Sequence, residues 1–163
     1  MQELKLKNLV LRRMVESDFD FFTILTQDVD ITKYFINFID SNFFDEMIIG
    51  QQSEENLFLV VCNENRLPIG ILNALYTANN QWLIEYAILS SYRRKGYIYA
   101  VLSFICQNSL TFLTAFQTNK SDISSLLFDV KDDNFASQGV LKKLAHNLNL
   151  ELEIQKDFYE IVF

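Results

Sequence analysis

A short basic loop between a predicted strand and a predicted helix carries residue types that could hold a phosphate group. The strand, Gln81 to Leu89, is followed by Arg93, Arg94, Lys95 and Gly96. A helix that starts after this glycine offers unpaired backbone N–H groups and a partial positive charge at its first turn. Together these features favour a pyrophosphate cradle, although a solvated basic loop before a surface helix has the same composition.

A second segment with polar residues at a helix start lies further along the chain. Asn134 follows a predicted strand, Ser125 to Val130, and Ser137 stands one turn into the next predicted helix. Asn134 is either a helix N-cap or a residue that contacts a ligand, and the sequence leaves both readings open. Ser137 either lies near the reacting atoms or has a capping or surface role in the helix.

Hydrophobic patterning predicts the elements that must position these residues. The first strand runs through Leu4 to Leu11 and closes at Arg12. A helix capped by Ser17 follows it. The next predictions are a short helix with Ile31, Tyr34, Phe35, Phe38 and Ile39, and a helix capped by Ser41 with Gly50 just past its end. Three antiparallel strands are predicted at Leu57–Cys62, Ile69–Tyr76 and Gln81–Leu89, followed by a helix from Tyr97. The strand and helix around Asn134 come next, and two last strands are predicted at Leu150–Ile154 and Tyr159–Phe163. This order predicts one α+β domain over residues 1–163, with a central mixed sheet.

Composition excludes several classes of protein. Half of the 163 residues are hydrophobic, and one proline and four glycines exclude collagen-like and low-complexity chains. The formal net charge of −7 argues against nucleic acid as a partner. Cys62 and Cys106 are expected to be buried thiols in a reducing compartment, and the single His146 cannot build a multi-histidine metal site. With no signal peptide and no membrane-spanning stretch in the pattern, we expect a cytoplasmic protein without membrane or metal partners, as monomer or homodimer.

The two polar segments, in their order and spacing, resemble the GNAT superfamily of acetyl-CoA-dependent N-acetyltransferases over nearly the whole chain. The family's phosphate-loop pattern is Arg or Gln, two residues, Gly, one residue, then Gly or Ala; here Arg93 and Gly96 match it and Ile98 departs from it. Two further stretches are similar to the branch of ribosomal-protein alanine N-acetyltransferases: Leu9 to Arg12 with Ser17 and Asp18, and Asn134 to Leu144.

The resemblance implies a twisted mixed sheet that splays at the cofactor strand, with helices on both faces and acetyl-CoA as co-substrate. By similarity, backbone groups of Tyr86, Ala87 and Ile88 would hydrogen-bond the pantetheine arm. Asn134 would contact the pantetheine or the acetyl-bearing end. The backbone amides that would hold the pyrophosphate are those of Arg93, Arg94, Lys95, Gly96, Tyr97 and Ile98.

The implied reaction is attack of an uncharged amine on a thioester, which requires a general base because a protonated amine has no lone pair. Glu85 is the one carboxylate inside the predicted cofactor strand and is the candidate base, with a solvent-facing or ion-paired strand residue as the alternative. Many family members place a tyrosine acid where Leu141 stands here. Ser137 is therefore the candidate near the sulfur, and Tyr86, Tyr97 and Tyr99 are further donors or packing aromatics.

The amine acceptor is a protein N-terminus or a small molecule. Phe35, Phe38, Phe43 and Phe44 line an acceptor groove in one reading and form core in the other. Because Ile98 and Leu141 depart from the family pattern, a catalytically impaired binding module on the same fold is the alternative function.

Overall fold

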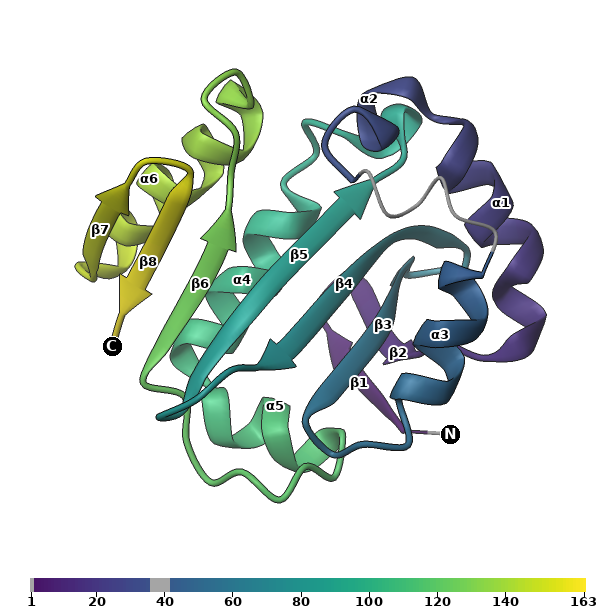
Figure 1. The fold of residues 1–163 in the computed structure, drawn as a ribbon, viewed down its shortest axis with the longest axis horizontal. Helices are drawn as coiled ribbons and strands as arrows, with labels where there is room; N and C mark the ends of the chain where they lie inside the picture. The colour runs from purple at the N-terminus through teal and green to yellow at the C-terminus, as the bar shows by residue number, and fades with distance from the viewer. Residues whose placement is uncertain (1, 36–41) are drawn as a thin grey trace.

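One mixed sheet runs through the computed structural model, which describes residues 2–35 and 42–163 (Figure 1). In this part of the chain the sheet has eight strands, in the spatial order β1-β2-β3-β4-β5-β6-β8-β7. The strands are β1 (Glu3–Leu6), β2 (Leu9–Arg13), β3 (Asn56–Asn63), β4 (Pro68–Tyr76), β5 (Gln81–Ile88), β6 (Ser125–Asp129), β7 (Glu151–Gln155) and β8 (Phe158–Val162). Every neighbouring pair is antiparallel except β5 and β6, which run parallel. The predicted α+β class and the three-strand meander are confirmed.

Helices cover both faces of the sheet, and each face has its own hydrophobic core. The helices are α1 (Phe19–Gln27), α2 (Val29–Thr32), α3 (Phe43–Gly50), α4 (Tyr97–Gln107), α5 (Ser109–Ala115) and α6 (Phe135–Leu148). In Figure 1, α3 lies in front of the sheet and α4 passes behind it. The rear core includes Trp82 and Phe112, both fully buried, and the front core includes Phe22 and Met47. Side chains alternate between the two cores along each central strand, so β3 to β5 are apolar on both faces.

The N-terminal prediction of one long strand is wrong, because the chain folds back at Lys7 and Asn8. β1 and β2 form an antiparallel hairpin in which Leu6 pairs with Leu9, and Leu4 with Leu11. The hairpin keeps the backbone groups of both short strands hydrogen-bonded and brings the leucines together. Asn8 is the residue whose turn preference signals this break.

Several helix boundaries also differ from the predictions. α1 begins at Phe19, and the residue at its N-cap position is Asp18 rather than Ser17. α2 has four residues, so Tyr34 and Phe35 follow it instead of lying inside it. Gly50 is the last residue of α3 and α5 was not predicted, while the expectations for Phe38, Ile39 and Ser41 lie outside the described residues.

The carboxyl-terminal half follows the predicted order closely. Asn134 caps α6 through its side chain, which accepts a hydrogen bond from the Ser137 amide at 3.2 Å. Both cysteines are free thiols; Cys62 is buried as expected, whereas Cys106 is only half-buried. Over residues 2–35 and 42–163, no single helix is long and apolar enough to span a membrane, although α4 and α5 together pass that test with a bend of 102° between them.

The parallel strands β5 and β6 separate part of the way along. Their pairing covers three positions, from Gln81 opposite Ser125 to Leu83 opposite Leu127. Beyond Leu83, β5 continues to Ile88 paired only with β4 on its other side. The two strands diverge toward their carboxyl ends in Figure 1, as expected for a splayed sheet.

Candidate functional site

A cavity of about 250 Å³ lies where β5 and β6 part. It contains the predicted Glu85, Tyr86, Asn134 and Ser137, from β5 on one side and the start of α6 on the other. Its full lining is Tyr34, Phe35, Phe43, Ile84, Glu85, Tyr86, Phe128, Asp129, Val130, Lys131, Asn134 and Ser137. The structure thus brings together four candidates that are up to 52 residues apart in the sequence, Glu85 and Ser137 being the outermost pair.

The loop between β5 and α4 has an open helix N-terminus, as the sequence indicated. Gly96 is the N-cap of α4 and has a φ of +79°, in the left-handed region that favours glycine. A Cβ added at Gly96 would meet no heavy atom within 4 Å, so the approach to the first turn is unobstructed on that side. The N–H groups of the first helical turn have no intrahelical acceptor, and they suit an anion.

The sequence favours a phosphate-binding role for the charge of Arg93, but in the structure its side chain bonds other groups of the protein. Its Nε donates to the Ile88 carbonyl at 2.8 Å, and its terminal nitrogens lie 2.9 Å from Asp28 Oδ2 and 2.6 Å from Asp30 Oδ2. The Arg93 amide donates to the Ser90 carbonyl at 3.3 Å. Arg93 therefore ties the loop after β5 to α2, and the exposed Arg94 and Lys95 carry the remaining positive charge.

Asp28 holds this junction from the other side. Its side chain caps α2 through the amides of Asp30 and Ile31, and it also accepts from the Ser90 amide at 3.2 Å. Burial raises the pKa of Asp28, but the hydrogen bond and charge of Arg93 and the backbone donors lower it more, so the net shift is downward. The carboxylate is thus kept ionised at neutral pH.

The residues just inside α4 pack inward. Tyr97 and Ile98 are half-buried against the rear core. Because the cavity is lined by other residues, the branched Ile98 side chain leaves it open.

The candidate base Glu85 is half-buried in the cavity wall. Its Oε2 accepts a hydrogen bond of 3.2 Å from the side-chain amide of Asn73, which lies directly opposite on β4. Its hydrogen-bond partner is therefore a neutral amide, and the role of Glu85 as the base stays a prediction.

Tyr86 places a buried hydroxyl at the same cavity. Its ring packs edge-on against Phe128, with centroids 6.4 Å apart, and its hydroxyl is buried without a well-formed hydrogen bond. Burial raises the pKa of Tyr86 to about 12, and the neighbouring Ser137 opposes that shift. Tyr86 is thus a neutral donor at physiological pH, and Ser137 lies beside it.

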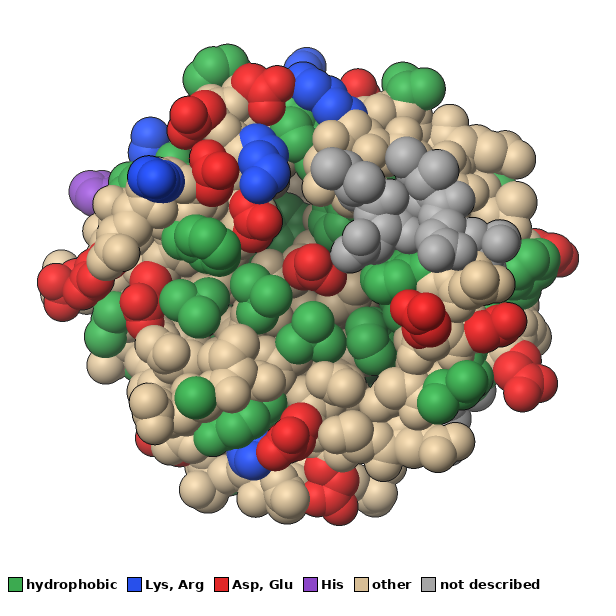
Figure 2. All heavy atoms as spheres, in the orientation of Figure 1, with side chains coloured by type: hydrophobic (Ala, Val, Ile, Leu, Met, Phe, Trp, Pro, Cys, Tyr) green, Lys and Arg blue, Asp and Glu red, His purple; other side chains and the backbone are tan. Residues whose placement is uncertain are grey.

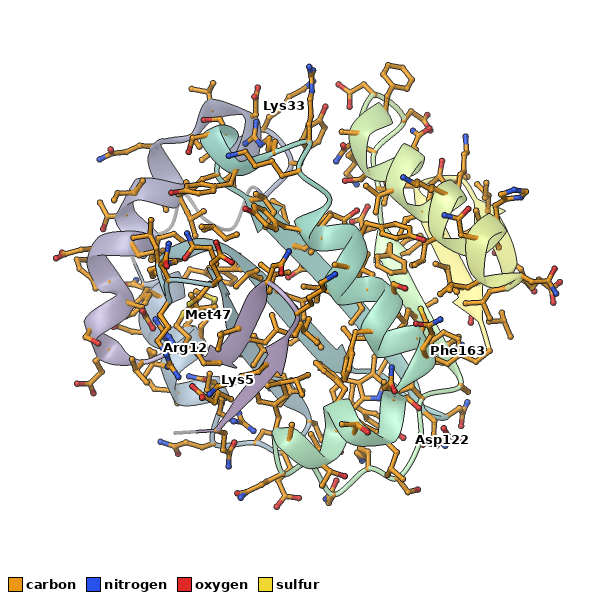
Figure 3. The ribbon with its side chains drawn as sticks, turned by 180° about the vertical axis from the view of Figure 1, so that it is seen from behind. Lys5, Arg12, Lys33, Met47, Asp122 and Phe163 are labelled. Carbon is orange, nitrogen blue, oxygen red and sulfur yellow. The ribbon has the colours of Figure 1, made fainter. Side chains whose placement is uncertain are left out.

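The segment after α2 reaches across to the start of α6. Lys33 Nζ lies 2.6 Å from Asp133 Oδ2, and the Tyr34 hydroxyl donates to the Asp133 carbonyl at 3.2 Å. The hydrogen bond to Asp133 raises the pKa of Lys33, which is labelled at the edge of the molecule in Figure 3. With the Arg93 contacts, these bonds connect α2 to both sides of the splayed strands.

The four phenylalanines expected at an acceptor groove divide between the two readings. Phe35 and Phe43 line the cavity, Phe44 is buried in the front core, and Phe38 lies outside the described residues. Leu141, at the position of the family tyrosine, is fully buried in the rear core.

On the face drawn in Figure 2, acidic side chains lie around a central group of hydrophobic ones.

Sequence reasoning missed Asn73, Asp28 and Asp30. Asn73 interrupts an apolar run in β4, and a polar residue inside a buried strand is a signal that could have found it. The aspartates gave no such signal, because their partner Arg93 lies more than 60 residues away. Across residues 2–35 and 42–163, no three His, Cys, Asp or Glu side chains gather into a group that could hold a metal ion.

Comparisons with known proteins agree with this geometry. A family model described as an acetyltransferase (GNAT) domain matches residues 8–145. No curated protein sequence matches the chain. Among solved structures, a GNAT-family acetyltransferase from Bacillus anthracis superposes with a TM-score of 0.73 at 15% identity, covering 98% of both chains.

Two other solved structures were determined with the cofactor. The microcin C7 self-immunity acetyltransferase MccE, in complex with acetyl-CoA and AMP, has a TM-score of 0.72 at 15% identity, covering 97% of this chain and 94% of its own. The ribosomal L7/L12 alpha-N-protein acetyltransferase RimL, in complex with coenzyme A, has a TM-score of 0.74 at 15% identity and the same coverage. At this identity the likeness concerns the fold.

Proposed function

Because this chain belongs to the GNAT family of acetyltransferases, we propose that it transfers the acetyl group of acetyl-CoA to a primary amine by direct attack in a ternary complex. The observation that carries the proposal is the cavity between the parted strands, whose lining includes a carboxylate, a neutral phenol and a hydroxyl. We further propose that residues 1–163 form one catalytic domain that needs no metal.

The residues present fit acetyl-CoA. Beyond Leu83 the edge of β5 that faces β6 is free of ladder pairing, so backbone groups of Tyr86 and Ala87 would bond the pantetheine arm. Since the Ile88 carbonyl and the Arg93 amide are already bonded, we assign the pyrophosphate to the amides from Arg94 to Ile98. Asn134, at the cavity, would contact the same arm.

Acetyl-CoA supplies an acetyl thioester, whose carbonyl carbon an uncharged amine can attack. Glu85 would accept the proton of the attacking amine. Tyr86 and Ser137 are hydroxyl donors at the cavity, where one of them would protonate the leaving thiolate or stabilise the developing oxyanion. Tyr86 suits hydrogen-bond donation to the oxyanion, because its raised pKa, about 12, keeps the proton on the phenol.

The acceptor is a protein N-terminus or a small-molecule amine. The net charge of −7 and the acidic side chains on the face of Figure 2 attract a cationic amine at long range. RimL, described as a ribosomal L7/L12 alpha-N-protein acetyltransferase, supports a protein N-terminus as one acceptor class to test.

The proposal is tested by binding and by turnover. Acetyl-CoA at a hundred times its dissociation constant stabilises a native protein by about 2.7 kcal/mol, so it should raise the melting temperature. A thiol-release assay over a panel of amines, with alanine- and serine-terminated peptides included, should then identify an acceptor. Gly96→Pro should weaken acetyl-CoA binding, since proline cannot adopt the positive φ of Gly96. Absence of both a thermal shift and thiol release at millimolar acetyl-CoA would refute the proposal.

A catalytically impaired binding module is the second candidate. It is favoured by the buried Leu141 at the position of the family tyrosine and by the branched Ile98 in the phosphate loop. Isothermal titration and the thiol-release assay together separate the two functions. An impaired module binds coenzyme A in the titration but releases no thiol from acetyl-CoA with any amine of the panel.

A further inference from the structure

Asn73 is a polar residue at the centre of a buried strand. It is fully inaccessible to solvent and lies between the apolar residues Leu72 and Ala74 on β4. Its Nδ2 donates to Glu85 Oε2 at 3.2 Å, and the two residues are direct cross-strand partners. Its Oδ1 is buried and has no hydrogen-bond partner among residues 2–35 and 42–163.

Fold stability alone does not explain this amide. A buried polar group that is only half satisfied is less favourable than an apolar side chain of similar shape. Leucine has nearly the same size and would fill the same position on a strand of aliphatic residues. The contact that Asn73 does make, with Glu85, is therefore the feature to explain.

The direction of this hydrogen bond suits a base. The amide donates to one carboxylate oxygen, Oε2, so this bond does not occupy the other. It also fixes the rotation of a side chain that otherwise has several rotamers. The second oxygen, Oε1, stays available to receive a proton.

We propose that Asn73 is a positioning residue, which holds the Glu85 carboxylate in the orientation that takes the proton of the acceptor amine. This inference rests on the role of Glu85 in the proposed function. As the amine nitrogen forms its bond to the acetyl carbon, its proton passes to Glu85 and the thiolate leaves with the electron pair of the C–S bond.

Other charged and titratable groups line the same cavity as Glu85. Among the described residues they are Asp129 and Lys131 from β6 and the loop after it, Tyr34 from the segment after α2, and Tyr86 from β5 itself. Asn73 is distinct from all of these because it bonds the Glu85 carboxylate directly.

The test compares Asn73→Leu and Asn73→Asp with Ser125→Ala. Ser125 is a matched control, because it is also buried in the sheet with an unpartnered side-chain oxygen, and it lies on the paired part of β6. Asn73→Leu should keep or raise the melting temperature while kcat falls about ten- to a hundred-fold, since misplacing a reacting group has effects of that size. The KM for acetyl-CoA should stay within about two-fold of wild type if the residue acts only on Glu85.

A double mutant separates positioning from a structural role. Asn73→Asp keeps the shape of the side chain but loses the amide donor, so it should lower kcat as Asn73→Leu does. In a Glu85→Gln background, Asn73→Leu should have little additional effect on kcat. Ser125→Ala should leave kcat unchanged in both backgrounds.

A spectroscopic measurement keeps this inference separate from the proposed function. Carbon NMR of the Glu85 carboxyl group at pH 7, assigned with Glu85→Gln, should show a changed chemical shift in Asn73→Leu whether or not an acceptor is known, because the hydrogen bond to that group is lost. An unchanged chemical shift together with an unchanged kcat in Asn73→Leu would overturn the inference while leaving the acetyltransferase assignment intact. Full activity of Glu85→Gln would overturn it together with the base assignment.

Discussion

Replacing Arg93 with methionine removes the guanidinium that ties the loop after β5 to α2. The methionine keeps most of the aliphatic length, so the change is chiefly one of charge and hydrogen bonding. Three contacts are lost, to the Ile88 carbonyl, to Asp28 and to Asp30, at 2.8, 2.9 and 2.6 Å.

The expected loss of stability follows from the exposure of each partner. The Asp30 side chain is 68% exposed, so its ion pair contributes little. Asp28 is 10% exposed, but it retains the amides of Ser90, Asp30 and Ile31 and is not left unpartnered. The Asp28 and Ile88 bonds together should then be worth about 2 kcal/mol. For a chain of this length that lowers the melting temperature by about 4–8 °C.

The loss should depend on pH. Asp28 has a lowered pKa in the folded protein, so its pairing stabilises the fold at pH values above its unfolded pKa, about 4, and this stabilisation is lost as the pH falls through the lower folded pKa. Thermal denaturation from pH 7 downward should show the difference between wild type and Arg93→Met constant to about pH 5 and shrinking below about pH 4.

Arg94→Met is the matched control. Arg94 is the next residue and is exposed, so its replacement should change stability by no more than about 0.5 kcal/mol. Equal melting temperatures for the two variants at pH 7, or a difference that is as large at pH 2 as at pH 7, would refute the assignment of Arg93 as the tie between the loop and α2; the part due to the Ile88 carbonyl does not titrate and should remain.

Three further substitutions test the surrounding structure by thermal denaturation. Gly70→Ala should cost about 1–3 kcal/mol of folding stability, because a Cβ there would overlap the Ala87 carbonyl and lie 2.5 Å from Ile88 Cδ1. The control Gly139→Ala, in open space on α6, should be neutral or stabilising. Equal losses of stability in the two variants would contradict the argument. Asn134→Ala should cost about 1 kcal/mol through loss of the α6 cap, whereas Asn134→Asp should retain it. Arg12→Met should cost about 3 kcal/mol, since it leaves the buried Asp18, bonded to Arg12 at 2.6 and 2.7 Å, with the Val15 amide as its remaining donor among the described residues; a loss below about 1 kcal/mol would show that this pair is not structural.

The elements that flank the candidate site could be predicted from the sequence because their signals are local. The apolar runs of β3 to β5, the Asn134 cap and the glycine before α4 each depend on a few adjacent residues. The prediction failed at the N-terminal hairpin, where one continuous alternating pattern hides a turn at Lys7 and Asn8.

Contacts between distant residues account for the rest of the differences. Arg93 was read as a phosphate contact from its basic neighbours, yet its side chain pairs with aspartates that precede it by 65 and 63 residues. Asn73 and Glu85 become partners only through the register of β4 and β5.

By itself, the sequence determined the order of strands and helices from β3 onward, apart from α5, and the open glycine turn, since backbone preference and hydrophobic period act over a few neighbouring residues. The tertiary structure alone decided that β5 and β6 part after Leu83, that a cavity opens there, and which partner each charged side chain takes. Those outcomes depend on how the strands register and how α2 and α6 pack across their ends, which no short stretch of the chain encodes.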